Sequence, residues 1–135
     1  MKKLDCILLV EDDDTINFYN QFLIQNLGLA KEVVITKNGQ EALTHLNKIG
    51  AEGGKFPELI LLDINMPVMN GFEFIEAYDQ LSEDWKAKML IVMLTTSHHE
   101  NDLLRAKQHG SIAEYFFKPL LEQRLGDLIA QYFPA

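Results

Sequence analysis

Acidic residues directly follow two short apolar segments of this sequence. Glu11 and Asp12 come after the run Cys6–Val10, and Asp63 comes after Leu59–Leu62. Short, continuously apolar runs are typical of buried strands, and the carboxyl ends of parallel strands meet at one edge of a sheet. The sequence therefore predicts three carboxylates crowded into one crevice.

Carboxylates at such close range repel one another, and some would be protonated at neutral pH unless a cation offset their charge. A hard divalent cation such as Mg²⁺ prefers oxygen ligands, and Lys118 follows another apolar run, Tyr115–Phe117. The alternative is a solvated acidic loop at a helix N-terminus, where the helix dipole favours negative charge. We prefer that alternative for Asp13 and Asp14, and find it weaker for acids that close two separate strands.

A carboxylate beside Mg²⁺ and a lysine can attack a phosphoryl group and become an aspartyl phosphate. Phosphoryl transfer needs in-line positioning and stabilisation of charge on the equatorial oxygens. Mg²⁺ and the Lys118 ammonium would stabilise that charge. The hydroxyl of Thr95, which follows the run Met89–Leu94, could hydrogen-bond a third oxygen.

Apolar runs alternate with amphipathic segments along the whole chain. The expected strands are Cys6–Val10, Val33–Thr36, Leu59–Leu62, Met89–Leu94 and Tyr115–Phe117. Helical periodicity predicts helices over residues 16–27, 42–49, 71–81, about 100–109 and 121–132, with Gly28, Gly50 and Gly110 as stop signals. Residues 50–55 are expected to form a loop, and residues 83–85 a turn.

This alternation predicts an α/β fold with parallel strands, right-handed crossovers and helices on both faces of the sheet. We expect the flavodoxin-like (βα)5 arrangement, with five strands in the order 2-1-3-4-5. In that order the first and third strands flank the point where strand order reverses, which is where function gathers in such sheets. The expected fold would therefore bring the acidic residues together.

The composition narrows the function classes. The chain has 135 residues and a net charge of −8, from 12 Lys and Arg against 20 Asp and Glu. This length suits one domain, and the acidic balance argues against binding nucleic acid or an anionic membrane surface. The one cysteine, Cys6, cannot form an internal disulfide, which fits a cytoplasmic protein.

The chain resembles the receiver domain of response regulators in two-component signalling. Ile7–Asp13 resembles the acidic first-strand motif of that family, and Leu59–Pro67 with Gly71 resembles its phosphoacceptor motif, D-x-x-M-P-x-x-x-G. Val92–Thr96 resembles the switch-threonine strand, and Tyr115–Pro119 resembles the switch aromatic followed by a Lys-Pro pair. The resemblance covers essentially the whole chain.

The resemblance implies a phosphorylation site. Asp63 would accept the phosphoryl group, and Thr95 and Lys118 would contact it. The Lys118–Pro119 peptide bond is expected to be cis, as is usual in the family, which would direct Lys118 into the pocket.

The resemblance also implies a metal site. Mg²⁺, or Mn²⁺ in its place, would be bound by the side chains of Asp12 and Asp63 and by the backbone carbonyl of Asn65. Glu11 would bind it directly or through water, since this position holds a glutamate rather than an aspartate.

A conformational switch is implied as well. Thr95 would move toward the phosphoryl group, and Tyr115 would rotate into the vacated space. The surface of the fourth expected helix, the last strand and the fifth expected helix would then change shape for a partner. Thr96 would govern access of the phosphoryl group, and Asn65 and Ser97 would tune its hydrolysis. Without a switching role, Tyr115 would be an ordinary edge-strand aromatic.

One departure from the family pattern concerns the approach to the last strand. The stretch from Gly110 to Tyr115 is one residue longer than expected. We therefore expect the loop before this strand to differ from the family pattern.

The resemblance implies a stand-alone response regulator, with residues 1–135 forming the receiver domain and no output domain. Its chemistry would be limited to self-phosphorylation and autodephosphorylation, so no metabolic substrate is expected. A histidine kinase or phosphotransfer protein would supply the phosphoryl group, and a downstream target protein would receive the signal.

Three other functions fit parts of the sequence. A haloacid-dehalogenase-type phosphatase also forms an aspartyl phosphate, but it carries D-x-D on its first strand. A flavodoxin-like electron carrier needs a first loop that cradles the phosphate of FMN, and an acidic loop would repel it. A degenerate receiver would act as a phosphorylation-independent docking module, although the expected chemical residues are all present.

Overall fold

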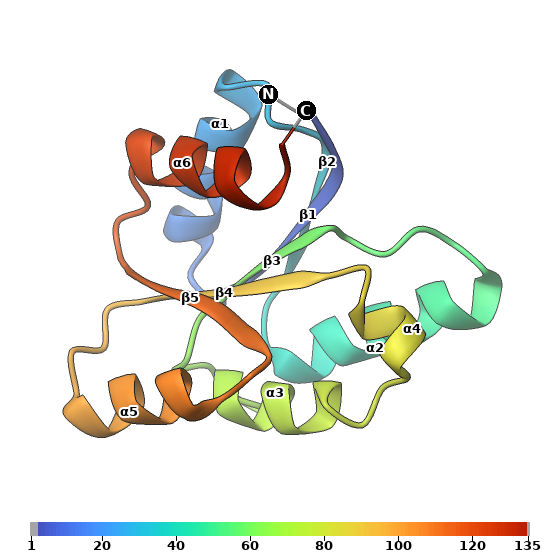
Figure 1. Ribbon diagram of the computed structural model, residues 1–135. Helices are drawn as coiled ribbons and strands as arrows, with labels where there is room; N and C mark the ends of the chain where they lie inside the picture. Colours follow the sequence, from blue (N-terminus) through green and yellow to red (C-terminus); the bar gives the residue numbers. More distant parts are fainter. Residues whose placement is uncertain (1–2, 135) are drawn as a thin grey trace.

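A computed structural model describes residues 3–134 as a five-stranded parallel sheet with helices on both faces (Figure 1). The strands are β1 Leu4–Val10, β2 Ala30–Thr36, β3 Leu59–Leu62, β4 Leu90–Thr95 and β5 Ile112–Phe117. The helices are α1 Asp14–Asn26, α2 Gly39–Glu52, α3 Gly71–Tyr78, α4 Glu83–Lys86, α5 Glu100–Gln108 and α6 Glu122–Tyr132. The strand order is β2-β1-β3-β4-β5, which confirms the predicted flavodoxin-like fold.

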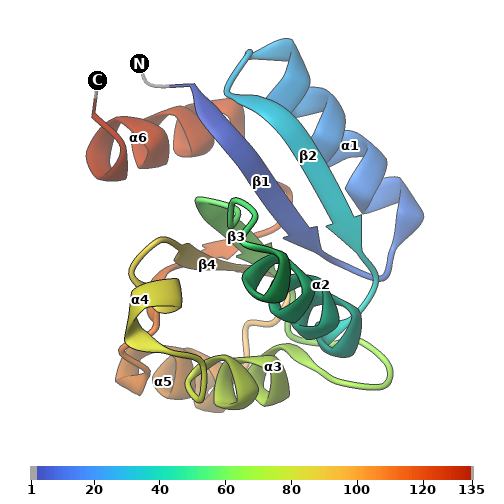
Figure 2. The ribbon, with the colours of Figure 1, turned by 90° about the vertical axis from the view of Figure 1, so that its right-hand side faces the viewer.

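Two apolar layers hold the helices to the sheet. On one face, Leu8 and Val10 of β1 pack with side chains of α2, α3 and α5. On the other face, Ile7 and Leu9 pack with side chains of α1 and α6. Figures 1 and 2 show the same division of the helices between the two faces. Because both faces of β1 are covered, every side chain from residue 7 to residue 10 must be apolar.

The second helix does not stop where the sequence predicts. Gly50 was the expected stop signal, but α2 continues to Glu52 and ends at Gly53, which has a φ of 68°. Gly50 is needed for packing instead, because a Cβ there would lie 2.0 Å from the indole ring of Trp85. The loop expected over residues 50–55 therefore begins later than predicted.

Residues 83–85 also differ from the prediction. They belong to the short helix α4, which begins after the Ser82 side chain caps the amide of Trp85. The Trp85 ring also packs against Phe56, with ring centroids 5.1 Å apart. This contact between distant segments explains why local sequence indicated only a turn.

The strand boundaries show where the extra residue near the last strand is accommodated. Strand β5 begins at Ile112, three residues before the predicted start at Tyr115. Ile91 pairs with Ile112 but Val92 pairs with Glu114, so Ala113 is an extra residue opposite β4. The departure expected in the loop before the last strand is thus accompanied by an irregularity within β5 itself.

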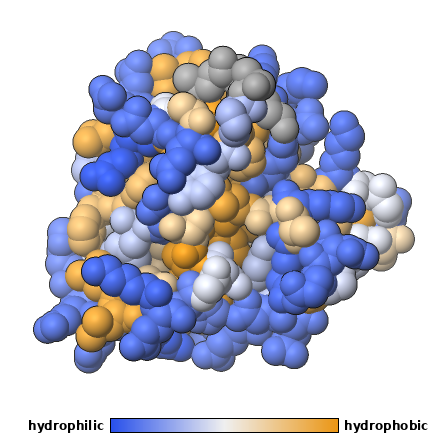
Figure 3. Space-filling model, in the orientation of Figure 1, coloured by the Kyte–Doolittle hydropathy of each residue, from blue (hydrophilic) through white to orange (hydrophobic). Residues whose placement is uncertain are grey.

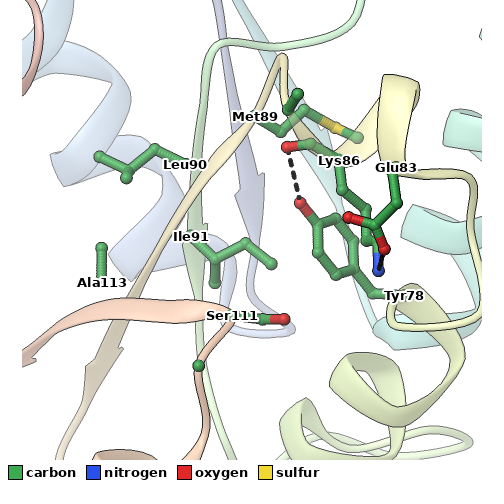
Figure 4. Close-up of a pocket in the computed structure, with 10 residues that line it drawn as sticks. Tyr78, Glu83, Lys86, Met89, Leu90, Ile91, Ser111 and Ala113 are labelled. Carbon is green, nitrogen blue, oxygen red and sulfur yellow. Dashed lines mark hydrogen bonds and ion pairs between the residues drawn. The ribbon is translucent and has the colours of Figure 1, made fainter.

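A cavity of about 320 Å³ opens at the end of β4 and β5 that lies away from the acidic residues. Its lining includes Tyr78, whose hydroxyl donates to the Lys86 carbonyl, and Ser111 (Figure 4).

The face shown in Figure 3 is largely hydrophilic, with hydrophobic side chains visible in its middle. Within residues 3–134, no helix has the length and apolar character that crossing a bilayer requires.

Two glycines in helices should respond oppositely to alanine. Gly50→Ala should lower the free energy of unfolding by about 1–3 kcal/mol, because its Cβ would overlap the Trp85 ring. Gly126→Ala should raise it by about 0.5–1 kcal/mol, because a Cβ there meets nothing within 4 Å and alanine favours a helix. Urea unfolding measures both values, and equal effects at the two positions would contradict the assigned contact.

Candidate functional site

Adjacent strands place the two buried acids side by side. Val10 of β1 pairs with Leu62 of β3, so the residues that follow them leave the sheet at the same edge. The Asp63 amide donates to the Val10 carbonyl at 3.0 Å, and the Glu11 amide donates to Thr36 at 3.0 Å. Strand pairing therefore places the backbones of Glu11 and Asp63 at the same edge of the sheet.

The predicted carboxylate cluster is present. Glu11, Asp12 and Asp63 each offer an oxygen, and these oxygens lie within 4.8 Å of one another. Glu11 and Asp63 are only 4% and 7% exposed, whereas Asp12 faces solvent. The cluster is thus open on one side and enclosed on the other, which suits an ion that keeps some of its water.

Lys118 lies in the crevice with the acids. Its ammonium forms an ion pair with Glu11 and lies 3.4 Å from the Asp63 Oδ2 atom. The Lys118 amide donates to the Thr95 carbonyl at 2.9 Å, which ties β5 to the end of β4. The Lys118–Pro119 bond is cis, as expected.

The protein supplies less positive charge than the crevice needs. The pKa of Glu11 is raised to about 7, mainly by burial and also by the charge of Asp63, although Lys118 acts in the opposite direction. One lysine therefore does not fully offset the buried acids. An all-oxygen donor set with a remaining excess of negative charge fits Mg²⁺ or Mn²⁺.

Hydrogen bonds orient both buried carboxylates. The Asp63 Oδ1 atom accepts the amide of Ile64 at 2.8 Å, which leaves Oδ2 directed to the Lys118 side of the crevice. The Glu11 Oε2 atom accepts the amide of Asp13 at 3.2 Å. Asp63 therefore has one oxygen held by a backbone amide and one that faces the Lys118 ammonium.

The loop after Asp63 is shaped by a close backbone approach. The Gly71 amide donates to the Ile64 carbonyl at 2.8 Å, and a Cβ on Gly71 would lie 2.3 Å from the Asp63 carbonyl oxygen. Only glycine permits this approach, which explains the glycine of the D-x-x-M-P-x-x-x-G motif. Asn65 lies in this loop and is exposed.

Val68, in the same loop, adopts a backbone conformation that suits it poorly. Its φ is 69°, and its side chain is 80% exposed. A β-branched residue is disfavoured in the left-handed region, because its Cβ crowds the backbone. The turn geometry required by the loop therefore outweighs the preference of the residue.

The residues expected to act as a switch lie on the neighbouring strands β4 and β5. Thr95 is fully buried, and its hydroxyl accepts the amide of Ser97 at 3.1 Å. Tyr115 of β5 is half-buried, and its hydroxyl donates to the Ser97 carbonyl at 3.0 Å. Thr96, between them in sequence, is exposed. Thr95 and Tyr115 are thus joined through one residue.

Asp13 and Asp14 lie at the start of α1, as predicted. Asp13 caps α1 by accepting the amides of Thr15 and Ile16, and Asp14 pairs with Lys37.

The sequence did not predict a role for Asn17, which is buried and donates to the Glu11 carbonyl at 2.8 Å. An asparagine next to the apolar stripe of α1 was the signal that could have revealed it.

Comparison with known protein families gives a match over nearly the whole chain. The model of the response regulator receiver domain matches residues 7–130. Response regulator Rcp1 of Synechocystis is 35% identical over 99 residues, which cover 73% of this chain and 66% of Rcp1. Protein PilH of Pseudomonas aeruginosa is 30% identical over 122 residues, covering 88% of this chain and 89% of PilH.

Solved structures agree with the sequence comparisons. A two-component response regulator from Cytophaga hutchinsonii has a TM-score of 0.87 and 32% identity, and the match covers 96% of this chain and 97% of that one. Chemotaxis protein CheY4 of Vibrio cholerae has a TM-score of 0.75 and 27% identity, covering 95% of this chain and 98% of that one. By contrast, the chain spans half the length of another relative, the probable C4-dicarboxylate response regulator DctR of Halalkalibacterium halodurans.

Burial of Glu11 should make stability depend on pH when no divalent cation is added. The folded carboxyl has a pKa of about 7 against an ordinary 4.5, so the folded state holds this proton more tightly. The free energy of unfolding should therefore fall as the pH rises from about 4.5 to about 7.

Glu11→Gln should flatten this dependence in urea unfolding measured across that pH range. The exposed Glu52 provides the matched control, and Glu52→Gln should leave the slope as in the parent chain. A Glu11→Gln protein with an unchanged slope would show that Glu11 ionises as easily in the folded state as in the unfolded state.

Replacing Val68 should stabilise the protein. Val68→Asn should raise the free energy of unfolding by about 1 kcal/mol, because asparagine tolerates a positive φ better than valine. Val68→Thr removes the same exposed apolar surface but keeps the β-branch, so it should give little gain. Equal gains from both variants in urea unfolding would point to the apolar surface rather than the backbone.

Proposed function

The chain belongs to the response regulator receiver domain family, and from that premise we propose that it accepts a phosphoryl group on Asp63 and passes the signal to a protein partner. The observation that carries this proposal is the crevice itself. Asp63 is buried beside Glu11, Asp12 and Lys118, with one oxygen facing the lysine. Membership in this family sets the chain apart from metabolic enzymes, including the phosphatase considered above, and from flavodoxin-like electron carriers.

The proposed reaction is an in-line displacement at phosphorus. The Asp63 Oδ2 atom attacks the phosphoryl group of a phosphohistidine, a new P–O bond forms, and the P–N bond to the departing imidazole breaks. The Lys118 ammonium, now 3.4 Å from Oδ2, contacts a phosphoryl oxygen. Hydrolysis later removes the phosphoryl group: water attacks phosphorus, the P–O bond to Asp63 breaks, and the Asp63 carboxylate is restored.

The crevice residues fit a divalent cation that takes part in this reaction. The side chains of Glu11, Asp12 and Asp63 and the carbonyl of Asn65 would hold Mg²⁺, or Mn²⁺ in its place. The ion would neutralise the charge that builds up on the phosphoryl oxygens. Glu11, already paired with Lys118, can act through a water molecule.

We further propose that phosphorylation is read out through Thr95 and Tyr115. If the Thr95 hydroxyl turned toward the phosphoryl group, it would release the Ser97 amide. The Ser97 carbonyl, which accepts the Tyr115 hydroxyl, would then shift as well. Thr96 would control access to the crevice, and Asn65 and Ser97 would set the rate of hydrolysis. The output face would be the surface of α5, β5 and α6, on which Phe117 is 41% exposed.

A histidine kinase or phosphotransfer protein would be the donor, and a downstream protein would bind the output face. Residues 1–135 would act as one receiver domain. The second candidate is a degenerate receiver that docks to its partner without phosphorylation. The acids and the lysine gathered in one crevice, with Thr95 at the end of β4, favour the receiver that is phosphorylated.

Phosphorylation should be detectable directly by mass spectrometry. Incubation with Mg²⁺ and acetyl phosphate should add one phosphoryl group to the protein, and Asp63→Ala should abolish this addition. Lys118→Ala should slow it by about 10²–10³-fold, since it removes a charge aimed at the transition state. Chelation of Mg²⁺ should have an effect in the same direction.

The exposed Asp84 of α4 gives a matched control, because Asp84→Ala removes a carboxylate far from the crevice. This variant should be labelled like the parent chain. An Asp63→Ala protein that is labelled equally well would refute the assignment of Asp63. A parent chain that takes no label but still binds its partner would favour the degenerate receiver.

A further inference from the structure

Ser97 connects three separate parts of the structure. Its amide donates to the Thr95 hydroxyl at 3.1 Å, and its carbonyl accepts the Tyr115 hydroxyl at 3.0 Å. Its own hydroxyl donates to the Asp102 Oδ2 atom at 2.6 Å. The first two contacts belong to the end of β4 and to β5, whereas the third reaches into the first turn of α5.

Helix α5 begins without the usual side-chain cap. Its N-cap residue is His99, which makes no capping hydrogen bond through its side chain. The Ser97 hydroxyl accepts the His99 amide at 3.4 Å and donates to Asp102. The Ser97–Asp102 hydrogen bond therefore attaches the first turn of α5 to the loop after β4.

The contact between Ser97 and Asp102 is strong for a loop contact. A hydrogen bond from a hydroxyl to a carboxylate is charge-assisted, and such bonds are shorter and stronger than neutral ones. Ser97 is buried and Asp102 is half-buried, so water competes weakly for either group. The bond therefore joins the segment around Ser97 directly to the start of α5.

We propose that Asp102 is a positioning residue that couples the phosphorylation site to α5 by holding the Ser97 hydroxyl. This inference rests on the proposed function, since it concerns how a phosphoryl group on Asp63 reaches the output face. Thr95 and Tyr115 both act on the backbone of Ser97. Asp102 is the residue that connects this backbone to the helix.

The electrostatics of Tyr115 agree with this placement. Burial raises the pKa of Tyr115, and the charges of Asp102 and Asp63 raise it as well, while the bond to Ser97 lowers it. The charge of Asp102 therefore acts on the tyrosine that is bonded to Ser97. Tyr115 remains a protonated donor to the Ser97 carbonyl throughout the neutral pH range.

The test compares the effect of a phosphoryl mimic on amide chemical shifts in the crevice with its effect on those in α5. Backbone amide chemical shifts are recorded by NMR for the full chain before and after addition of Mg²⁺ and beryllofluoride. In the parent chain, shifts should occur at Ile64 in the crevice and along residues 100–108. In Asp102→Ala the shifts along α5 should be largely lost, while that at Ile64 and labelling of Asp63 by acetyl phosphate are retained.

Two variants separate positioning from a general structural effect. Asp102→Asn keeps an oxygen that accepts the Ser97 hydroxyl, so it should restore the shifts along α5. Glu100→Ala removes an exposed charge from the same turn of α5 and should behave like the parent chain.

Ser97→Ala removes the same bond without replacing a residue of α5, and it also removes the 3.4 Å contact with the His99 amide. It should lose the α5 shifts as Asp102→Ala does, and the double variant should lose no more than Ser97→Ala, because the bond between Ser97 and Asp102 is already absent there. Should Asp102→Ala unfold, the Ser97→Ala protein decides the question by the same measurement.

Full α5 shifts in Asp102→Ala, or their loss in Glu100→Ala or Asp102→Asn, would overturn the role of Asp102 and leave the phosphorylation of Asp63 standing. A parent chain that acetyl phosphate does not label at Asp63 would overturn both proposals together.

Discussion

The charge balance of the crevice is governed by the mutual repulsion of carboxylates at the ends of two paired strands. Strand pairing of β1 with β3 brings Glu11 and Asp63 together whether or not their charges favour it. Lys118 offsets part of that charge, and the raised pKa of Glu11 shows that a deficit remains. An ion or a phosphoryl group that enters this crevice therefore changes a balance that is already strained. That sensitivity is what a signalling site requires.

The sheet provides a rigid frame for this balance. Both apolar layers pack against β1, so the acidic ends of the strands cannot move apart without opening the core. The segments that we propose to carry the signal lie outside this frame. Ser97 lies in the loop after β4, and α5 begins with few side-chain restraints beyond the bond to Asp102. The crevice is thus held by the core, whereas the start of α5 is held by contacts with a surface loop.

Most of the fold could be predicted because the apolar runs are continuous and the helical stripes alternate with them. The errors arose where distant segments meet. Gly50 looked like a helix stop because glycine usually ends a helix, but here it makes room for Trp85. Residues 83–85 looked like a turn because α4 depends on the packing of Trp85 against Phe56. The extra residue before the last strand was visible, but its position within β5 follows from pairing with β4.

Which residue types end each strand, and with them the expected chemistry, can be seen in the chain without its fold. Acids after two apolar runs, a threonine after a third and a lysine after the last are local facts that any fold of this class would gather at one edge. The partners of those residues, by contrast, follow from the folded arrangement of the strands and loops. That Lys118 pairs with Glu11 as well as facing Asp63, and that Ser97 joins Thr95, Tyr115 and Asp102, depends on side-chain geometry between segments far apart in the chain. Spacing along a sequence carries no record of such geometry.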